Sequence, residues 1–105
     1  MLRLTLKKMW FDLMICGEKK IEYRKPSKWI LSRLENKDYK YIEFKNGYRK
    51  DSPRFVCEYL GYFYAEKNEI IYFSNGVKLD VEQGDIMIHL GKIIETDEQR
   101  IKQEI

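Results

Sequence analysis

The chain has 105 residues, enough for one domain and too few for two, and its 44% hydrophobic and 35% charged residues are typical of a globular protein. Its only histidine, His89, and its two distant cysteines, Cys16 and Cys57, argue against a histidine-based metal site, a zinc site or a Ser-His-Asp triad, so we expect no metal and no cofactor. The net charge of +3 is divided unevenly, with +8 in residues 1–54 and −5 in residues 55–105, which indicates an anionic partner bound mainly by the first half unless the charges only solvate the fold.

The first 17 residues are predicted to form a strand and a short helix. Three leucines alternate with polar residues over 2–7, and this period of two is typical of a half-buried strand. Apolar residues then recur at helical spacing over 8–16, and Gly17 stands where a helix C-terminal cap belongs.

A second strand and a second helix are predicted next. The strand lies within 19–24 and is entered through a loop, and its period of two places Glu22 and Arg24 on one face. Ser27 is a suitable N-cap for a helix over 28–34.

The remaining segments are predicted to be strands joined by turns. Strand patterns cover 39–48 with an Asn46-Gly47 turn signal, 54–65 with a bulge or bend at Gly61, 68–76 and 86–94, while 77–85 contains a further turn. From Glu95 onward the sequence is polar, so we expect a loosely attached tail over 95–105.

These elements predict an α+β, mainly β, domain over residues 1–94. Five or six short strands joined by turns favour antiparallel pairing, and closing them fully or partly into a small barrel removes exposed strand edges. Two short helices lie in the N-terminal part. Neither a signal peptide nor an apolar run long enough for a membrane span is present, so we expect a cytoplasmic protein without membrane contact.

The run Gly17-x-Lys19-x-x-Glu22-x-Arg24 resembles the signature of the ASCH domain family, which belongs to the PUA-like superfamily. The order of strands and helices agrees with that family over residues 2–94. The resemblance implies a small PUA-like β-barrel with a cleft lined by the motif residues. It also implies RNA or a nucleotide-like molecule as the ligand.

One subgroup of the family hydrolyses N4-acetylcytidine with the motif lysine, a threonine three residues later and a more distant glutamate. By resemblance the lysine is Lys19, whereas the threonine position holds Glu22, which cannot donate a hydrogen bond when ionised. Lys19 and Glu22 are therefore the candidate catalytic residues if the protein is an amidohydrolase or a ribonuclease. The candidates for the distant glutamate are Glu58, Glu66 and Glu69.

The chemistry of the motif also favours an anionic or carbonyl-rich ligand. Arg24 offers a planar fork for phosphate oxygens, and Lys19 can join it only if Lys19 lies in the loop, because strand period would place it opposite Glu22. Glu22 can orient the guanidinium or accept from a base amino group. The alternative is an ion network on a solvated strand, worth under about 1 kcal/mol per pair.

A second basic group follows the Asn46-Gly47 turn. Tyr48, Arg49 and Arg54 combine an aromatic ring with cations, as single-stranded RNA sites do, although such loops are also common as solvated hairpin ends. The tryptophans are expected in the core and His89 in a structural position. The predicted ligand-binding residues are Lys19, Lys20, Glu22, Arg24, Tyr48, Arg49 and Arg54.

Three functions remain open from the sequence. The first is binding of RNA or a modified nucleoside through the Lys19, Glu22 and Arg24 cleft. The second is an enzyme of the ASCH type. The third is a protein-interaction domain whose acidic second half meets a basic partner. The ligand and the oligomeric state are not determined by the sequence.

Overall fold

The computed structural model describes residues 1–97 of the chain. Two helices and seven strands lie within this part, and no helix in it is long and apolar enough to cross a membrane. In chain order the elements are β1 (Leu2–Leu6), α1 (Lys8–Ile15), β2 (Ile21–Arg24), α2 (Lys28–Leu34), β3 (Tyr41–Asn46), β4 (Arg54–Tyr64), β5 (Glu69–Tyr72), β6 (Lys78–Val81) and β7 (Ile86–Thr96).

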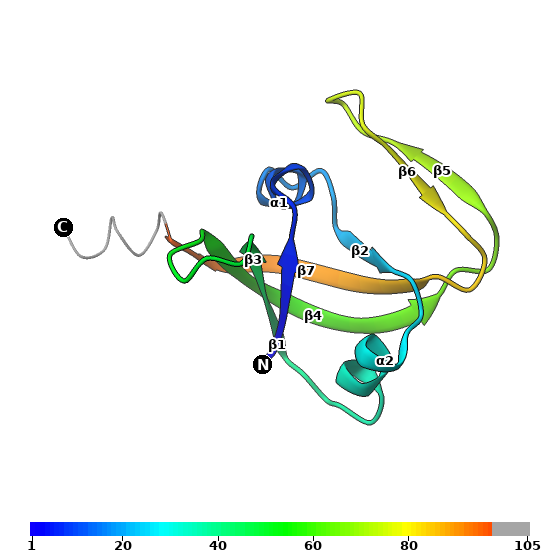
Figure 1. Ribbon diagram of the computed structural model, residues 1–105, viewed down its shortest axis with the longest axis horizontal. Helices are drawn as coiled ribbons and strands as arrows, with labels where there is room; N and C mark the ends of the chain where they lie inside the picture. The colour runs from blue at the N-terminus through cyan, green and yellow to red at the C-terminus, as the bar shows by residue number, and fades with distance from the viewer. Residues whose placement is uncertain (98–105) are drawn as a thin grey trace.

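Five strands form one curled sheet in the order β1-β3-β4-β7-β2. The long strands β4 and β7 run side by side through the middle of the molecule, and β1 and β2 form its edges (Figure 1). Only β1 and β3 pair in parallel, since the other three pairings in this sheet are antiparallel. The sheet is therefore a half-barrel with a seam between β1 and β2, and the β5–β6 hairpin is a separate two-stranded sheet.

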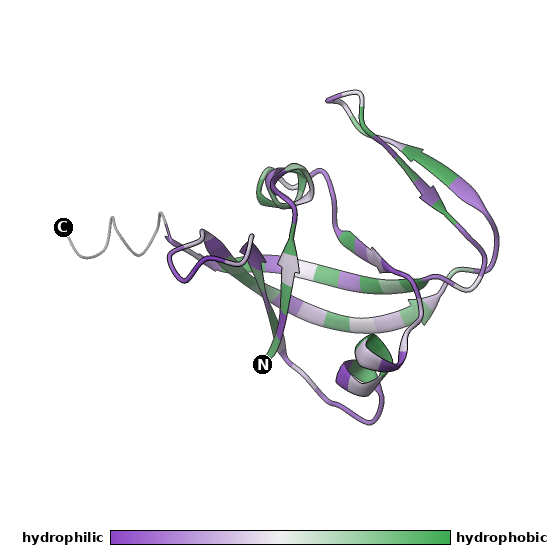
Figure 2. Ribbon diagram, in the orientation of Figure 1, coloured by the Kyte–Doolittle hydropathy of each residue, from purple (hydrophilic) through white to green (hydrophobic). Residues whose placement is uncertain are grey.

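The core lies inside the curl of the sheet. Alternation of apolar and polar residues along the strands, visible in Figure 2, sends one set of side chains inward. Helix α1 adds Phe11 and Met14 to the core, and α2 adds Ile30 and Leu34, which are four residues apart on one face. The side chains that are most fully buried are Phe44, Phe55, Leu34, Ile42, Ile86, Ile88 and Cys57.

Local sequence signals account for most element ends. Ser27 caps α2, because its hydroxyl oxygen accepts from the Ile30 N–H at 3.2 Å. Gly17 follows α1 with φ of +87°, a left-handed conformation that favours glycine. Gly61 has φ of +106° at a shift of register between β4 and β7, which confirms the predicted bulge.

Three predictions about the fold were wrong. The strand β6 was missed because residues 78–81 lie among turn residues, so the chain has seven strands in the described part rather than five or six. Strand β7 continues through Glu95 and Thr96, which pair with β4, so these two residues belong to the sheet and not to a tail. The rest of the predicted tail, beyond Asp97, lies outside the described residues. Trp29, expected in the core, is 51% exposed because α2 is short and turns Ile30, Leu31 and Leu34 toward the core.

Candidate functional site

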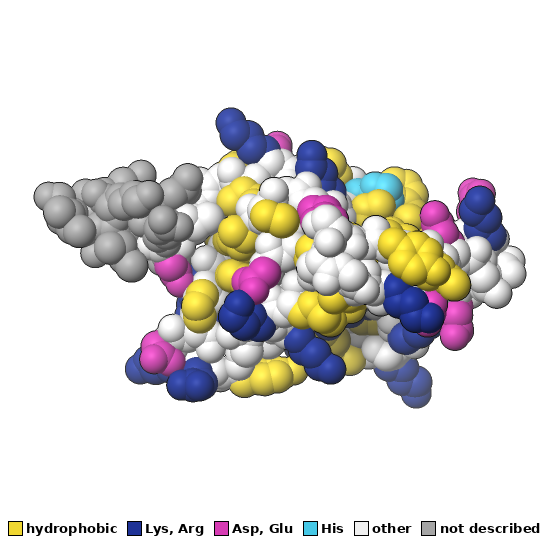
Figure 3. All heavy atoms as spheres, turned by 90° about the horizontal axis from the view of Figure 1, so that it is seen from above, with side chains coloured by type: hydrophobic (Ala, Val, Ile, Leu, Met, Phe, Trp, Pro, Cys, Tyr) yellow, Lys and Arg dark blue, Asp and Glu magenta, His cyan; other side chains and the backbone are white. Residues whose placement is uncertain are grey.

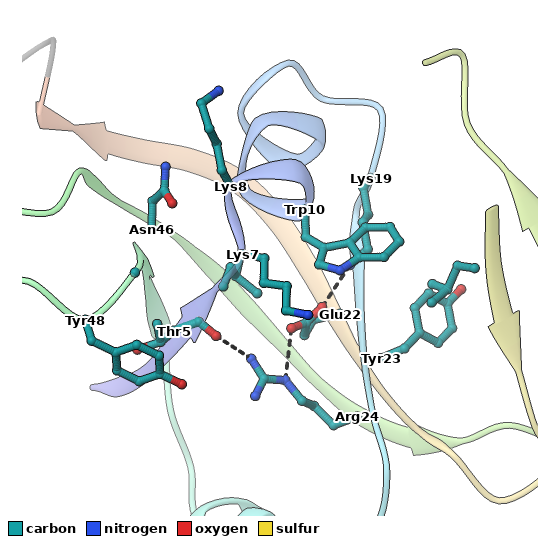
Figure 4. Close-up of a pocket in the computed structure, with 13 residues that line it drawn as sticks. Thr5, Lys7, Lys8, Trp10, Lys19, Glu22, Tyr23, Arg24, Asn46 and Tyr48 are labelled. Carbon is teal, nitrogen blue, oxygen red and sulfur yellow. Dashed lines mark hydrogen bonds and ion pairs between the residues drawn. The ribbon is translucent and has the colours of Figure 1, made fainter. Parts of the chain in front are cut away.

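A cleft of about 540 Å³ opens at the seam between β1 and β2. This volume lies within the range of small-molecule sites, which is roughly 300–1,000 Å³. Figure 4 shows the side chains around it. They come from both edge strands, the start of α1, the loop between α1 and β2, the end of β3 with the loop after it, and β6. The lining residues are Thr5, Leu6, Lys7, Lys8, Trp10, Lys19, Glu22, Tyr23, Arg24, Asn46, Gly47, Tyr48 and Leu79.

The loop between α1 and β2 turns the Lys19 ammonium inward. Strand β2 begins only at Ile21, so Lys19 lies in the loop, as convergence with Glu22 requires. Its side chain is 3% exposed. The Lys19 Nζ donates to the Ile21 carbonyl oxygen at 2.7 Å and to the Glu22 Oε1 at 2.8 Å.

The Glu22 carboxylate lies between two cations. Its Oε1 accepts from Lys19, and its Oε2 accepts from the Arg24 Nε at 2.9 Å. The Arg24 Nη2 donates to the Thr5 carbonyl oxygen at 2.9 Å and so spans the seam from β2 to β1. Glu22 therefore orients the guanidinium, and we call Lys19, Glu22 and Arg24 the charge triad.

The surroundings of Lys19 lower the pKa of its ammonium group. Burial lowers the pKa of the Lys19 ammonium, and the positive charge of Arg24 lowers it further, whereas the Glu22 carboxylate raises it. The Trp10 and Tyr23 rings each lie with their centroid 5.7 Å from the Nζ, within cation–π range, and such contacts favour the ammonium form. Burial is therefore the main cause that lowers the pKa of Lys19. A lysine held in this way is closer to losing its proton than one in water.

The cleft offers mainly hydrogen-bond donors. Arg24 uses two of its five N–H groups on Glu22 and Thr5, and its other three have no partner among residues 1–97. In Figure 4, Lys7 extends toward the middle of the cleft while Lys8 points away, and Lys8 pairs with Asp12. Both oxygens of Glu22, the one carboxylate among the lining residues, are already occupied. The cleft therefore suits a ligand rich in acceptors, such as a phosphate or a carbonyl compound.

Four of the predicted ligand-binding residues line the same cleft, namely Lys19, Glu22, Arg24 and Tyr48. Tyr48 is 90% exposed at the edge formed by the loop after β3. Figure 4 shows it on the opposite side of Arg24 from Tyr23.

The other three predicted residues do not line the cleft. Lys20 does not line the cleft but borders two adjoining hollows, which share Lys19 with it. Arg49 lines a neighbouring polar hollow that shares Asn46 with the cleft. Arg54 lies 3.6 Å from the Glu43 carboxylate and donates to the Lys50 carbonyl oxygen at 3.3 Å, so it is engaged on the β3–β4 side.

Sequence reasoning missed Trp10, Lys7 and Thr5 as lining residues. Trp10 was expected in the core, and it packs against the core but also lines the cleft. Lys7 follows directly after β1 and is exposed, a position with no local signal for a site. Thr5 takes part through its backbone carbonyl oxygen, which side-chain chemistry cannot reveal.

No distant glutamate completes the arrangement that the amidohydrolase resemblance implies. Glu58 lies on β4, and its carboxylate accepts from the Lys92 N–H of β7 at 2.9 Å. None of Glu58, Glu66 and Glu69 lines the cleft. Glu69 lies near enough to Tyr23 that its charge, after burial, helps to raise the pKa of that hydroxyl.

Comparison of the chain with protein-family models, with curated proteins and with solved structures found no match. Within residues 1–97, no group of three or more histidine, cysteine, aspartate or glutamate side chains is arranged to hold a metal ion. The case for a function therefore depends on the cleft itself.

Proposed function

We propose that this protein binds RNA or a modified nucleoside in the cleft, as a PUA-like ASCH domain. The motif supports this proposal, since its lysine, glutamate and arginine meet at one cleft in a curled, half-closed sheet. The lining residues supply both parts that such a ligand needs. Cations at the centre suit a phosphate or a base carbonyl, and Trp10, Tyr23 and Tyr48 offer rings for a base.

The observation that carries the proposal is the state of Arg24. Its guanidinium is fixed by Glu22 and Thr5, yet its side chain remains 27% exposed at the cleft, and three of its N–H groups have no partner within residues 1–97. A planar fork held in place before binding loses little conformational entropy when an oxyanion arrives. The donors that Glu22 and Thr5 leave over are available to a ligand oxygen in the cleft.

The proposal is tested by titrating the protein with a short, fluorescently labelled single-stranded RNA at about 50 and 200 mM salt. Binding should weaken with salt, since each neutralised phosphate contributes a slope of about −0.7 in log K against log salt. Lys7→Ala should make this slope shallower by about 0.7, because Lys7 is exposed at the cleft and has no ion-pair partner within residues 1–97.

Lys37→Ala is the matched control, because Lys37 is an exposed lysine in the α2–β3 loop that does not line the cleft. It removes the same charge and should leave the slope unchanged. Binding that ignores salt, or equal effects of the two variants, would count against the cleft as an RNA site.

A second candidate function is hydrolysis of an acylated nucleoside, and the geometry of Lys19 favours it. A neutral Lys19 amine would give its two N–H groups to Ile21 and Glu22, which leaves its lone pair free to accept a proton. Incubation with N4-acetylcytidine and chromatography for cytidine tests this. Turnover should disappear in Lys19→Ala and persist in Lys20→Ala, whose side chain lies outside the cleft. Absence of cytidine with the wild type would rule this function out for that substrate.

A further inference from the structure

The β5–β6 hairpin stands apart from the main sheet. Its strands pair only with each other among residues 1–97. Two short connecting segments, residues 65–68 and 82–85, join it to β4 and β7, and we call them the hairpin stalks. In Figure 1 it leaves the ends of those long strands and runs back toward the side of the molecule on which α1 lies. A hairpin whose strands pair with no other strand within residues 1–97 can swing relative to the sheet when the contacts at its tip are released.

One face of the hairpin looks inward over the site. Leu79 and Ile71 are directly paired across the two strands and both are half-buried, whereas Tyr72, on the other face, is 73% exposed. Leu79 lines the cleft, and Ile71 lines an adjoining hollow of about 320 Å³. Tyr23 borders both spaces, so the inner face of the hairpin overhangs the Tyr23 end of the cleft.

The hairpin is held in this position at its tip. Both oxygens of the exposed Glu18 carboxylate accept from Ser74, one from its N–H at 2.6 Å and the other from its hydroxyl at 2.7 Å. Next to them, the Phe73 ring meets the edge of the Trp10 ring with centroids 6.0 Å apart. Glu18 directly precedes Lys19 in the chain, so the loop that carries the motif lysine also carries the contact that holds the hairpin.

We infer that the hairpin is a hinged wall of the cleft that closes on a flat ring of the ligand, with Leu79 as its contact and the Glu18–Ser74 pair as its latch. Leu79, Tyr23 and Trp10 supply apolar surface to the cleft, and Phe73 of the hairpin packs against Trp10. The donors that have no partner within residues 1–97 belong to Arg24 and Lys7, which come from β2 and from the residue that follows β1. The acceptor-rich group of a ligand and its flat apolar group therefore bind at different ends of the cleft. That the flat group is a nucleobase rests on the proposed function.

The ring contact is tested with 2-aminopurine ribonucleoside monophosphate, whose fluorescence changes on stacking, and with ribose 5-phosphate, which lacks the base. Leu79→Ala should raise the dissociation constant of the first about 5- to 20-fold, since it removes apolar contact with the base. Leu79→Ala should leave the dissociation constant of ribose 5-phosphate unchanged. Ile70→Ala is the control, because Ile70 lies on the outer face of the same hairpin.

The latch is tested by the rates of binding in a stopped-flow experiment and by hydrogen exchange without ligand. Glu18→Gln should raise the association and dissociation rates of the 2-aminopurine nucleotide several-fold, with a smaller change in affinity. It should also speed exchange of the hairpin amides while leaving those of β4 and β7 unchanged. Glu66→Gln removes the same charge from the hairpin stalk outside the latch and should change neither.

The outcomes separate this inference from the proposed function. If the wild type binds neither probe, the ring contact and the single-nucleotide form of the proposed function both fail, while the RNA titration still decides RNA binding and the exchange result still decides whether the hairpin is hinged. If the wild type binds the nucleotide and Leu79→Ala binds it equally well, the inferred wall is wrong and the proposed function stands. Unchanged rates and exchange in Glu18→Gln would overturn the latch.

Discussion

Glu22 is the residue on which the charge triad depends, since its two oxygens balance one cation each. Glu22→Gln should destabilise the protein by about 3–5 kcal/mol, because it leaves the buried Lys19 charge without its counter-ion. That is a large part of the roughly 5–15 kcal/mol that holds a typical domain together. Urea denaturation of both proteins measures the loss.

Glu43→Gln is the matched control for this prediction. Glu43 lies 3.6 Å from both Arg3 and Arg54, whose side chains are 68% and 31% exposed. Ion pairs near water contribute little, so we expect a loss below about 1 kcal/mol. Equal losses in the two variants would mean that burial of the triad has no energetic consequence.

Lys19 should make stability depend on pH in the alkaline range. Because burial lowers its pKa in the folded protein, the folded state releases this proton at a lower pH than the unfolded state, whose lysine titrates near 10.4. The unfolded state then binds more protons in that window, so the free energy of unfolding rises with pH across it.

The comparison with Lys19→Met isolates this effect, since Tyr23, Tyr59 and Tyr62, whose pKa values are raised mainly by burial, are common to both proteins. The unfolding free energy of the wild type minus that of the variant should increase as the pH rises from the lowered pKa of Lys19 toward about 10.4. NMR of the Lys19 Cε measures the midpoint directly. A midpoint at or above the ordinary lysine value would contradict the prediction.

The site residues that sequence predicted correctly are those whose geometry is local. A glycine turn and a strand period of two suffice to bring Lys19, Glu22 and Arg24 together, because only the eight residues from Gly17 to Arg24 are involved. The prediction that Lys20 binds the ligand in this cleft also depended on local geometry. The Lys20 carbonyl oxygen accepts from the Leu90 N–H, and its side chain borders another hollow instead of the cleft. Thr5 and Trp10 reach the cleft only through the sheet order, which no local pattern contains.

At the scale of elements, Gly91 marks where β7 bends past β4. A Cβ at this position would lie 2.9 Å from the Glu58 Cβ, closer than packed carbon atoms tolerate. Gly91→Ala should therefore destabilise the protein by about 1–3 kcal/mol. Glu58 also holds the strand beyond this point, because its carboxylate accepts from the Lys92 N–H.

A double-mutant cycle with Glu58→Gly tests the cause, since this change removes the Cβ that Gly91→Ala would meet. The double variant should be more stable than the sum of the two single losses predicts, by an interaction of about 0.5–3 kcal/mol. Strict additivity, measured by urea denaturation, would show that the close approach is not the source of the loss.

Helices and long strands were predicted from signals that their own residues carry, such as Ser27 and the leucines of β1. The strand β6 was missed although Val77, Leu79 and Val81 alternate, because only four residues pair and turn residues flank them. The parallel pairing of β1 with β3 was not predicted either, since it joins segments some forty residues apart across two helices.

For the whole molecule, the two halves of the sequence are not two halves in space. The acidic second half supplies β4 and β7, which lie between strands of the basic first half, and Figure 3 shows cations and anions interspersed on the face that it views. The charge difference still has a consequence. All lining residues of the cleft except Leu79 come from the first 48 residues, so the basic half does form its wall.

The seam between β1 and β2 is bridged by Arg24, whose Nη2 reaches the Thr5 carbonyl oxygen while its Nε holds Glu22. A lysine keeps the charge but is a single point donor without the planar fork. Arg24→Lys should keep the ion pair with Glu22, lose the bridge to β1 and lower RNA affinity about 10-fold or more. Hydrogen exchange of the β1 amides should become faster while that of β4 stays unchanged.

Arg33→Lys, the same change at an exposed position on α2, should alter neither the RNA affinity nor the exchange of the β1 amides. If Arg24→Lys binds RNA as the wild type does, the guanidinium fork is not what the ligand contacts, and if the exchange of β1 is unchanged, the bridge does not hold the seam.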